Sequence, residues 1–222
     1  MNIIQKVAQF NDEGILELAA AKYDAAKRNF ELALVNLQTI SNSNELTKQL
    51  NFATQPSLPN CVASSSISIS KLQNDRLYIY NQALRFTHHG TTFCRRDLAF
   101  CVSVILFNLA LVIHTESINM NDEYCLRRAL QMYNMSFEMA DEIALDSDHA
   151  RKMMVLTMNN KIHIHNELGS YSEQKQDVEI LEDMVSCLDS FCNEASLINN
   201  NIYREISLNR YMISQTTTAP CA

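Results

Sequence analysis

The chain has 222 residues, of which 47% are hydrophobic, and it contains only three glycines and three prolines. This length suits one domain or a short array of repeats, and the apolar content excludes global disorder. A sheet protein of this size needs many turns that use glycine and proline, so their scarcity favours an all-α fold. The net charge of −7 lacks the basic excess of a nucleic-acid-binding surface, and we expect no nucleic-acid partner.

The seven cysteines predict neither a disulfide framework nor a zinc site. Their number is odd, and no two have the Cys-x-x-Cys spacing. Polar residues interrupt the first apolar stretch, unlike in a signal peptide. The most apolar run, 98–113, is shorter than the ~20 residues that span a bilayer. We therefore expect a protein without metal or cofactor, without a membrane partner, in the cytoplasm or another reducing compartment.

A first helix pair is predicted over residues 1–40. Apolar residues recur at three- and four-residue steps over 3–19 and again from Ala25 to Ile40. The pattern breaks near 21–24. Because the break is short, the two helices should form an antiparallel hairpin.

Residues 41–91 interrupt this helical pattern. Ser, Asn, Thr and Gln dominate 41–75, which also holds Pro56 and Pro59, and we expect a long, mobile polar loop there. A short ordered connector, 77–87 (LYIYNQALRFT), follows. Its first residues alternate tyrosine with aliphatic side chains as in a strand, although its apolar residues also fit a helix. We expect extended structure at the start of this connector.

Two more helix pairs are predicted over 92–195. Their helices should span 94–116, 122–144, 149–168 and 172–190. Gly169 should end the third of these helices, because glycine tolerates the left-handed backbone conformation. A final helix over 202–213, in the terminal part 196–222, should cap the stack.

Part of the first pair has the spacing of a known repeat. Phe10, Gly14, Ala26 and Phe30 stand where the tetratricopeptide (TPR) signature places a large apolar residue and a glycine in its first helix and an Ala-x3-Phe pair in its second. Gly14 and Ala26 would let two helix backbones approach closely, with Phe30 filling the space beside them. The stretch 14–33 closely resembles a TPR repeat.

Two looser copies follow the first. In the second copy, Ala110 stands at the glycine position, Ala129 and Tyr133 form the second-helix pair, and the turn around 119–123 is expanded. The third copy is identified mainly from its turn, 167–171, which has a glycine and then a tyrosine. The resemblance covers about half of the chain.

The resemblance implies a TPR-like solenoid of about three antiparallel helix hairpins, divided by the polar insertion, with a concave groove lined by the first helix of each pair. TPR grooves bind an extended peptide or a partner helix. Carried over to this sequence, the groove positions are Asn11, Asp12, Ile15, Phe107, Asn108, Leu111, His114, Asn159, Asn160, His163 and Asn166. We therefore predict a non-enzymatic protein-interaction module with a protein or peptide partner, and self-association is a further alternative.

Asparagines recur at matching groove positions. Some TPR proteins hold a peptide backbone with a ladder of asparagines, because a primary amide both donates and accepts hydrogen bonds. Asp12, Asn108 and Asn160 occupy matching places in the three copies, with Asn11 and Asn159 beside them. The alternative interpretation is that asparagines, which are abundant in this chain, satisfy local backbone groups.

The sequence carries no phosphate-binding glycine loop and no nucleophile elbow. His163 and Glu167 have the four-residue spacing of a helical metal pair, but one pair makes no site. His163 and His165 point about 200° apart on a helix, so they cannot chelate one ion together. The alternative function is a helical enzyme or small-ligand sensor with a pocket between repeats, near His114 and His163.

Overall fold

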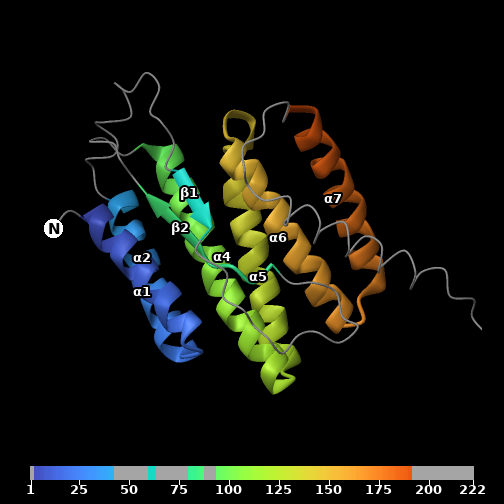
Figure 1. The fold of residues 1–222 in the computed structure, drawn as a ribbon, viewed down its shortest axis with the longest axis horizontal. Helices are drawn as coiled ribbons and strands as arrows, with labels where there is room; N and C mark the ends of the chain where they lie inside the picture. Colours follow the sequence, from blue (N-terminus) through green and yellow to red (C-terminus); the bar gives the residue numbers. More distant parts are fainter. Residues whose placement is uncertain (1–2, 43–59, 64–79, 88–93, 192–222) are drawn as a thin grey trace, which may run out of the picture.

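The computed structural model describes residues 3–42, 60–63, 80–87 and 94–191, and these residues are mostly helical, as predicted (Figure 1). In chain order the elements are α1 (Ile3–Ala19), α2 (Tyr23–Asn42), β1 (Asn60–Ala63), β2 (Leu84–Thr87), α4 (Arg95–Met120), α5 (Glu123–Asp141), a 3-10 helix (Ala144–Asp146), α6 (Asp148–Glu167) and α7 (Tyr171–Phe191). The predicted helix bounds agree with these to within a few residues. The predicted capping helix over 202–213 lies outside the described residues.

The described helices form antiparallel pairs that stand side by side in chain order (Figure 1). α1 packs on α2, α4 on α5, and α6 on α7. Contacts of α2 with α4 and of α5 with α6 join each pair to the next. α4 also contacts both α1 and α6, so the first helices of the pairs lie along one face. We call the face formed by α1, α4 and α6 the inner face.

The same turn ends the first helix of each pair. Ala21, Asn121 and Gly169 have positive φ angles of 55°, 54° and 66°. In each turn the N–H of this residue donates to the carbonyl three residues earlier, and the next N–H donates to the carbonyl five residues earlier. This is the Schellman arrangement, which satisfies carbonyls at a helix end. The predicted role of Gly169 is therefore confirmed.

The turn of the second pair differs from the prediction. We expected an expanded turn around 119–123, but α4 continues to Met120 and α5 begins at Glu123. The additional residues lengthen α4 rather than the turn, because extending a helix satisfies backbone groups that a loop would leave to water. The expanded turn is therefore wrong.

The first pair is closed by the contact that the repeat spacing predicts. Ala26 and Phe30 of α2 are fully buried. A Cβ atom added at Gly14 would lie only 2.6 Å from Cε1 of Phe30, far inside van der Waals contact. Gly14 is thus required by the close approach of Phe30, as the sequence indicated.

α4 is the central helix of the array. At 26 residues it extends beyond the apolar run 98–113, and it is the described helix that is long and apolar enough to cross a membrane by length and composition. However, 89% of its most apolar window is buried inside the protein, where α2, α5 and α6 pack against it. Packing against these helices accounts for its apolar sequence.

A short pair of strands lies on the inner face. β1 and β2 are antiparallel, with Ala63 opposite Leu84 and Asn60 opposite Thr87. β2 contacts α1 and α4 (Figure 1). The extended chain therefore crosses the face formed by the first helices.

These strands bear on two expectations for the insertion, of which they correct the first. β1 lies within 41–75, where we expected only a polar loop. β2 lies at the end of the connector 77–87, after residues 80–83, which are neither helix nor strand. The start of the connector, 77–79, where we expected extended structure, lies outside the described residues. Of the described part of the connector, 84–87 is thus extended, and none of it is helical. The rest of the insertion, 43–59 and 64–79, lies outside the described residues.

Candidate functional site

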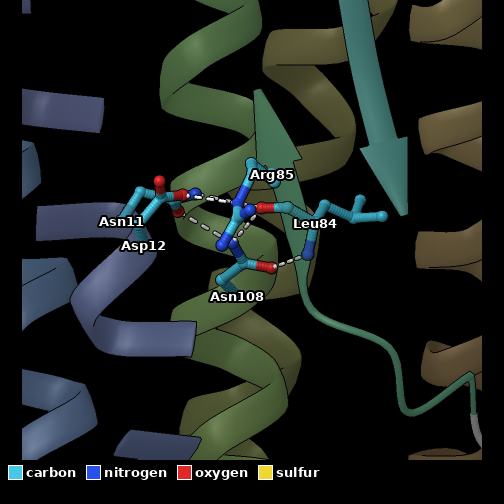
Figure 2. A network of polar contacts seen from close by, with 5 residues as sticks. All are labelled: Asn11, Asp12, Leu84, Arg85 and Asn108. Carbon is cyan, nitrogen blue, oxygen red and sulfur yellow. Dashed lines mark hydrogen bonds and ion pairs between the residues drawn. The ribbon is translucent and has the colours of Figure 1, made fainter. Parts of the chain in front are cut away.

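The candidate site is the place where residues 80–87, which we call the inner segment, lie on the inner face. Asn108, from the middle of α4, holds both backbone groups of Leu84. Its Oδ1 accepts the Leu84 N–H at 2.7 Å, and its Nδ2 donates to the Leu84 carbonyl at 2.7 Å. Asn11 of α1 donates to the same carbonyl at 3.1 Å and accepts from Asn108 Nδ2 at 2.9 Å. Figure 2 shows these groups converging from α1, α4 and β2.

A second asparagine holds the inner segment four residues earlier. The Oδ1 of Asn160, on α6, accepts the N–H of Tyr80 at 2.8 Å, and its Nδ2 donates to the Tyr80 carbonyl at 3.0 Å. Asn159 donates to the same Oδ1 at 3.3 Å. Two asparagines from two first helices therefore each bind the N–H and the C=O of one residue. We call these two contacts the asparagine clamps.

The asparagine clamps satisfy the hydrogen-bonding groups of the asparagine side chains and of the inner-segment backbone. Asn11, Asn108 and Asn160 are buried, and a buried polar group without a hydrogen bond costs about 1–3 kcal/mol. An extended backbone needs a neighbour that donates and accepts at each residue, which a strand normally supplies. Here amide side chains take the place of that neighbouring strand. This arrangement recognises a backbone and not a particular side chain.

Side chains of the inner segment fix its position between the asparagine clamps. Tyr80, Ala83, Leu84 and Phe86 are buried, whereas the residues between Tyr80 and Ala83 are partly exposed. The Tyr80 ring lies 6.2 Å from the ring of Phe107 on α4, centroid to centroid. Burial of large aromatic and aliphatic side chains supplies the apolar part of the contact.

One ion pair closes the edge of the site toward α1. The Nε of Arg85 lies 2.8 Å from Oδ1 of Asp12, and the two side chains are 43% and 41% exposed (Figure 2). Partial burial raises the pKa of Asp12, and the neighbouring Arg85 opposes this rise. Because both side chains remain partly exposed, the ion pair contributes more to selecting the side chain at position 85 than to stability.

Buried polar side chains continue inward from Asn160. Its Nδ2 donates to the hydroxyl of Tyr133 on α5 at 3.0 Å. The Tyr133 oxygen lies 3.5 Å from Nδ1 of His114, and Nε2 of His114 lies 3.1 Å from Nδ1 of His163. Nε2 of His163 is 3.9 Å from Oε1 of Glu167. A continuous row of polar groups thus connects a clamp to two histidines in the interior.

The protonation of this row follows from its contacts. If the Tyr133 hydroxyl accepts from Asn160 and donates to Nδ1 of His114, the proton of His114 must be on Nε2 and point to His163. Burial, and then the neighbouring His163, hold the pKa of His114 well below its usual 6.5. Burial likewise raises the pKa of the Tyr133 hydroxyl. Both groups are therefore neutral at pH 7 and act as hydrogen-bonding groups.

The structure places the predicted groove residues in different roles. Asn11, Asn108 and Asn160 hold the inner segment, and Asn159 supports Asn160. The remaining predicted positions are core residues (Ile15, Phe107 and Leu111), members of the buried row (His114 and His163), the ion-pair residue Asp12, and Asn166, which accepts from Gln174 on α7 at 3.4 Å. The ladder residue on α1 is thus Asn11, because Asp12 turns to the side chain of Arg85.

The sequence analysis did not identify two parts of the site. It treated the connector as a spacer, although LYIYNQALRFT is an apolar island next to a polar region and was therefore a candidate for burial. It also assigned Tyr133 only to packing between helices. The need of a buried tyrosine for a hydrogen-bond partner was the available signal.

Comparisons with known proteins identify no relative of this chain. No family model, no curated protein and no solved structure matches the chain significantly. Among the described residues, no group of three or more His, Cys, Asp or Glu side chains is arranged to hold a metal ion. The contacts of the inner segment are therefore the basis for a functional proposal.

Proposed function

We propose that this protein is a non-enzymatic interaction module of the TPR-like type, whose inner face binds an extended peptide. The observation that carries the proposal is the pair of asparagine clamps, in which Asn108 and Asn160 each bind the N–H and C=O of one residue. A surface that satisfies backbone groups at two places fixes both the direction and the register of a bound chain.

The architecture is consistent with this proposal. Helix hairpins of similar turn geometry stand side by side, and their first helices share one face, as in a TPR-like solenoid. Gly14, Ala26 and Phe30 make the close interhelical contact of the repeat. The inner segment supplies an example of what this face accepts, which is an extended chain with buried apolar side chains.

The alternative function, an enzyme or small-ligand sensor, has less support. It requires His114 and His163 to face a ligand. In the structure their nearest ring nitrogens are 3.1 Å apart, and both side chains are buried. These groups serve one another and Tyr133, so we do not propose a second function.

Peptide binding can be tested with a defined probe. The probe is an acetylated, fluorescein-labelled peptide with the sequence of residues 80–87, YNQALRFT. Because the wild-type inner face already holds this sequence, we use the full chain with Leu84→Ser and Phe86→Ser, which removes two apolar anchors. We call this chain the open variant. Fluorescence anisotropy should show saturable binding of the probe.

Asparagine variants then test the clamps. Asn108→Ala or Asn160→Ala in the open variant should each weaken binding about tenfold or more, because two hydrogen bonds of roughly 0.5–1.5 kcal/mol each are lost. Asn36→Ala is the matched control, since the Asn36 amide donates to the Leu32 carbonyl of its own helix and, among the described residues, to no part of the inner segment. Equal affinity of all three variants, or no binding by a folded open variant, would reject the proposed function.

A further inference from the structure

The inner segment has the properties of a bound ligand. It is held through its backbone at Tyr80 and Leu84 by side chains that lie 80 and 24 residues away in sequence. Strand β1 is its described strand neighbour, and α1, α4 and α6 are its helix contacts. A segment that serves only as a connection does not need two bidentate clamps on its backbone.

Its side chains define a sequence pattern. The residue at the first clamp, Tyr80, is aromatic and lies near Phe107. Ala83 is fully buried, and a larger side chain at this position would overpack the surrounding core, so a small residue is favoured. Leu84 and Phe86 fill buried positions, and Arg85 between them reaches Asp12. The positions of Asn81 and Gln82 are partly exposed and impose no such requirement.

From this pattern, and resting on the proposed function, we infer that the inner segment is an internal pseudo-ligand. The external ligand is an extended segment of a partner protein with the pattern aromatic-x-x-small-aliphatic-basic-aromatic. It occupies the same clamps after the inner segment leaves them. The pseudo-ligand and the partner thus compete for Asn108 and Asn160.

The connections of the inner segment permit this exchange. Six residues, 88–93, separate it from the start of the α4 region, and a chain of this length spans about 20 Å when extended. The segment can therefore leave the inner face without unfolding α4. A tethered ligand competes at an effective concentration that reaches the millimolar range for short connections. The apparent affinity for a partner is reduced by the fraction of molecules whose clamps are unoccupied.

Asp12 favours a positive charge at the ligand position that corresponds to Arg85. A basic residue next to the clamped aliphatic residue is favoured, because Asp12 lies 2.8 Å from Arg85 in the internal complex. An acidic residue at this place would face the Asp12 carboxylate and be disfavoured. The ion pair with Asp12 thus adds a preference for a basic side chain, which recognition of the backbone alone does not supply.

The first experiment compares the wild-type chain and the open variant by anisotropy, with the YNQALRFT probe and a scrambled peptide of the same composition. The open variant should bind the probe at least about tenfold more tightly than the wild type does, and it should bind the scrambled peptide more weakly. Equal binding of the probe by both chains would overturn the pseudo-ligand and leave the proposed function intact. Equal binding of both peptides by the open variant would overturn the sequence pattern.

A charge exchange tests the role of Asp12. A probe with glutamate in place of arginine, YNQALEFT, should bind the open variant up to about fivefold more weakly. Adding Asp12→Lys to the open variant should reverse the preference between the two probes. If Asp12→Lys leaves the preference unchanged, the basic position in the pattern is wrong.

A measurement on the wild-type chain covers the case in which the open variant does not fold. Amide hydrogen exchange of Tyr80 and Leu84 is recorded in the ¹⁵N-labelled chain, with and without a large excess of unlabelled YNQALRFT peptide. Displacement should speed exchange at these two residues and leave that of α4 unchanged. No change would overturn the inference. A wild-type dimer that Leu84→Ser/Phe86→Ser abolishes would also overturn it, by identifying a second copy of the chain as the partner.

Discussion

The first helix pair and the inner face are held together by different kinds of contact. Between α1 and α2 the contact is apolar and close, and the missing side chain of Gly14 leaves room for the ring of Phe30. On the inner face the contact with the inner segment passes through buried amides, chiefly Asn108 and Asn160. Apolar packing tolerates many side chains of similar volume, whereas a buried amide requires its partners in place. The contact between α1 and α2 should therefore tolerate apolar substitutions of similar volume, whereas the contacts of the inner face should tolerate few changes of residue.

The largest effect should come from removing an asparagine clamp. Asn108→Ala leaves the buried N–H and C=O of Leu84 and the amide of Asn11 with fewer partners. We expect a loss of about 3 kcal/mol in the free energy of unfolding, measured by urea denaturation. Asn36→Ala on α2, the second helix of the first pair, should change the free energy of unfolding by less than about 0.5 kcal/mol. Similar losses for both variants would show that asparagines of the inner face contribute no more to stability than an asparagine of α2.

A smaller effect is expected at the apolar contact. Gly14→Ala places a Cβ atom against the Phe30 ring, and overpacking of this kind costs about 2 kcal/mol. Phe30→Leu should relieve the clash, so the double variant should be more stable than the sum of the single changes predicts. Thermal or urea unfolding of the four chains measures this coupling. Additive losses would contradict the close contact.

Acidification should destabilise the buried row. Because the pKa of His114 is held below 6.5, the unfolded chain takes up a proton near pH 6.5 while the folded chain does not. Stability is therefore full above pH 6.5 and falls as the pH decreases below it, by up to about 1.4 kcal/mol per pH unit for one such histidine.

Urea denaturation at pH 7.5, 6.5 and 5.5 measures this dependence. His149 and His165, whose pKa values burial also lowers, contribute in the same direction. The test is therefore the comparison with His114→Gln, which should lose less stability between pH 6.5 and 5.5 than the wild type. Equal losses in the two chains would show that His114 is not held neutral.

The smallest effect concerns a turn. Ala21 has a φ of 55°, a conformation that disfavours residues with a Cβ atom. Ala21→Gly should raise the free energy of unfolding by up to about 1 kcal/mol, whereas Gly169→Ala, at a φ of 66°, should lower it by a similar amount. Opposite signs in matched unfolding experiments are the expected result. A destabilised Ala21→Gly chain would argue against the shared turn.

The helices could be predicted from sequence because their signals are local. Apolar periodicity located each described α-helix, Gly169 marked a helix end, and the spacing of Gly14 and Phe30 indicated their contact. The turn at Asn121 was mispredicted because asparagine adopts the left-handed conformation less often than glycine does, so it is a weaker signal for a helix end. Periodicity also does not show where a helix such as α4 gains an additional turn.

The contacts of the inner segment could not be predicted because its partners are distant in sequence. Asn11 and Leu84 are 73 residues apart, and nothing in either local sequence indicates the other. The recurrence of asparagines suggested a backbone-binding ladder, but not that the chain itself supplies the backbone. Whether an amide faces a local or a distant carbonyl depends on the packing of α1 against α4, which no short motif encodes.

The most direct test of the account replaces one peptide bond of the probe with an ester, which removes a single N–H and keeps every side chain. An ester at the leucine of YNQALRFT removes the N–H that Asn108 accepts, and an ester at the glutamine is the control, since neither clamp holds that residue. We predict that the leucine ester binds the open variant about fivefold to tenfold more weakly than the glutamine ester does. This difference should disappear when Asn108→Ala is added. Equal affinity of the two esters for the open variant would contradict recognition of the backbone by asparagine.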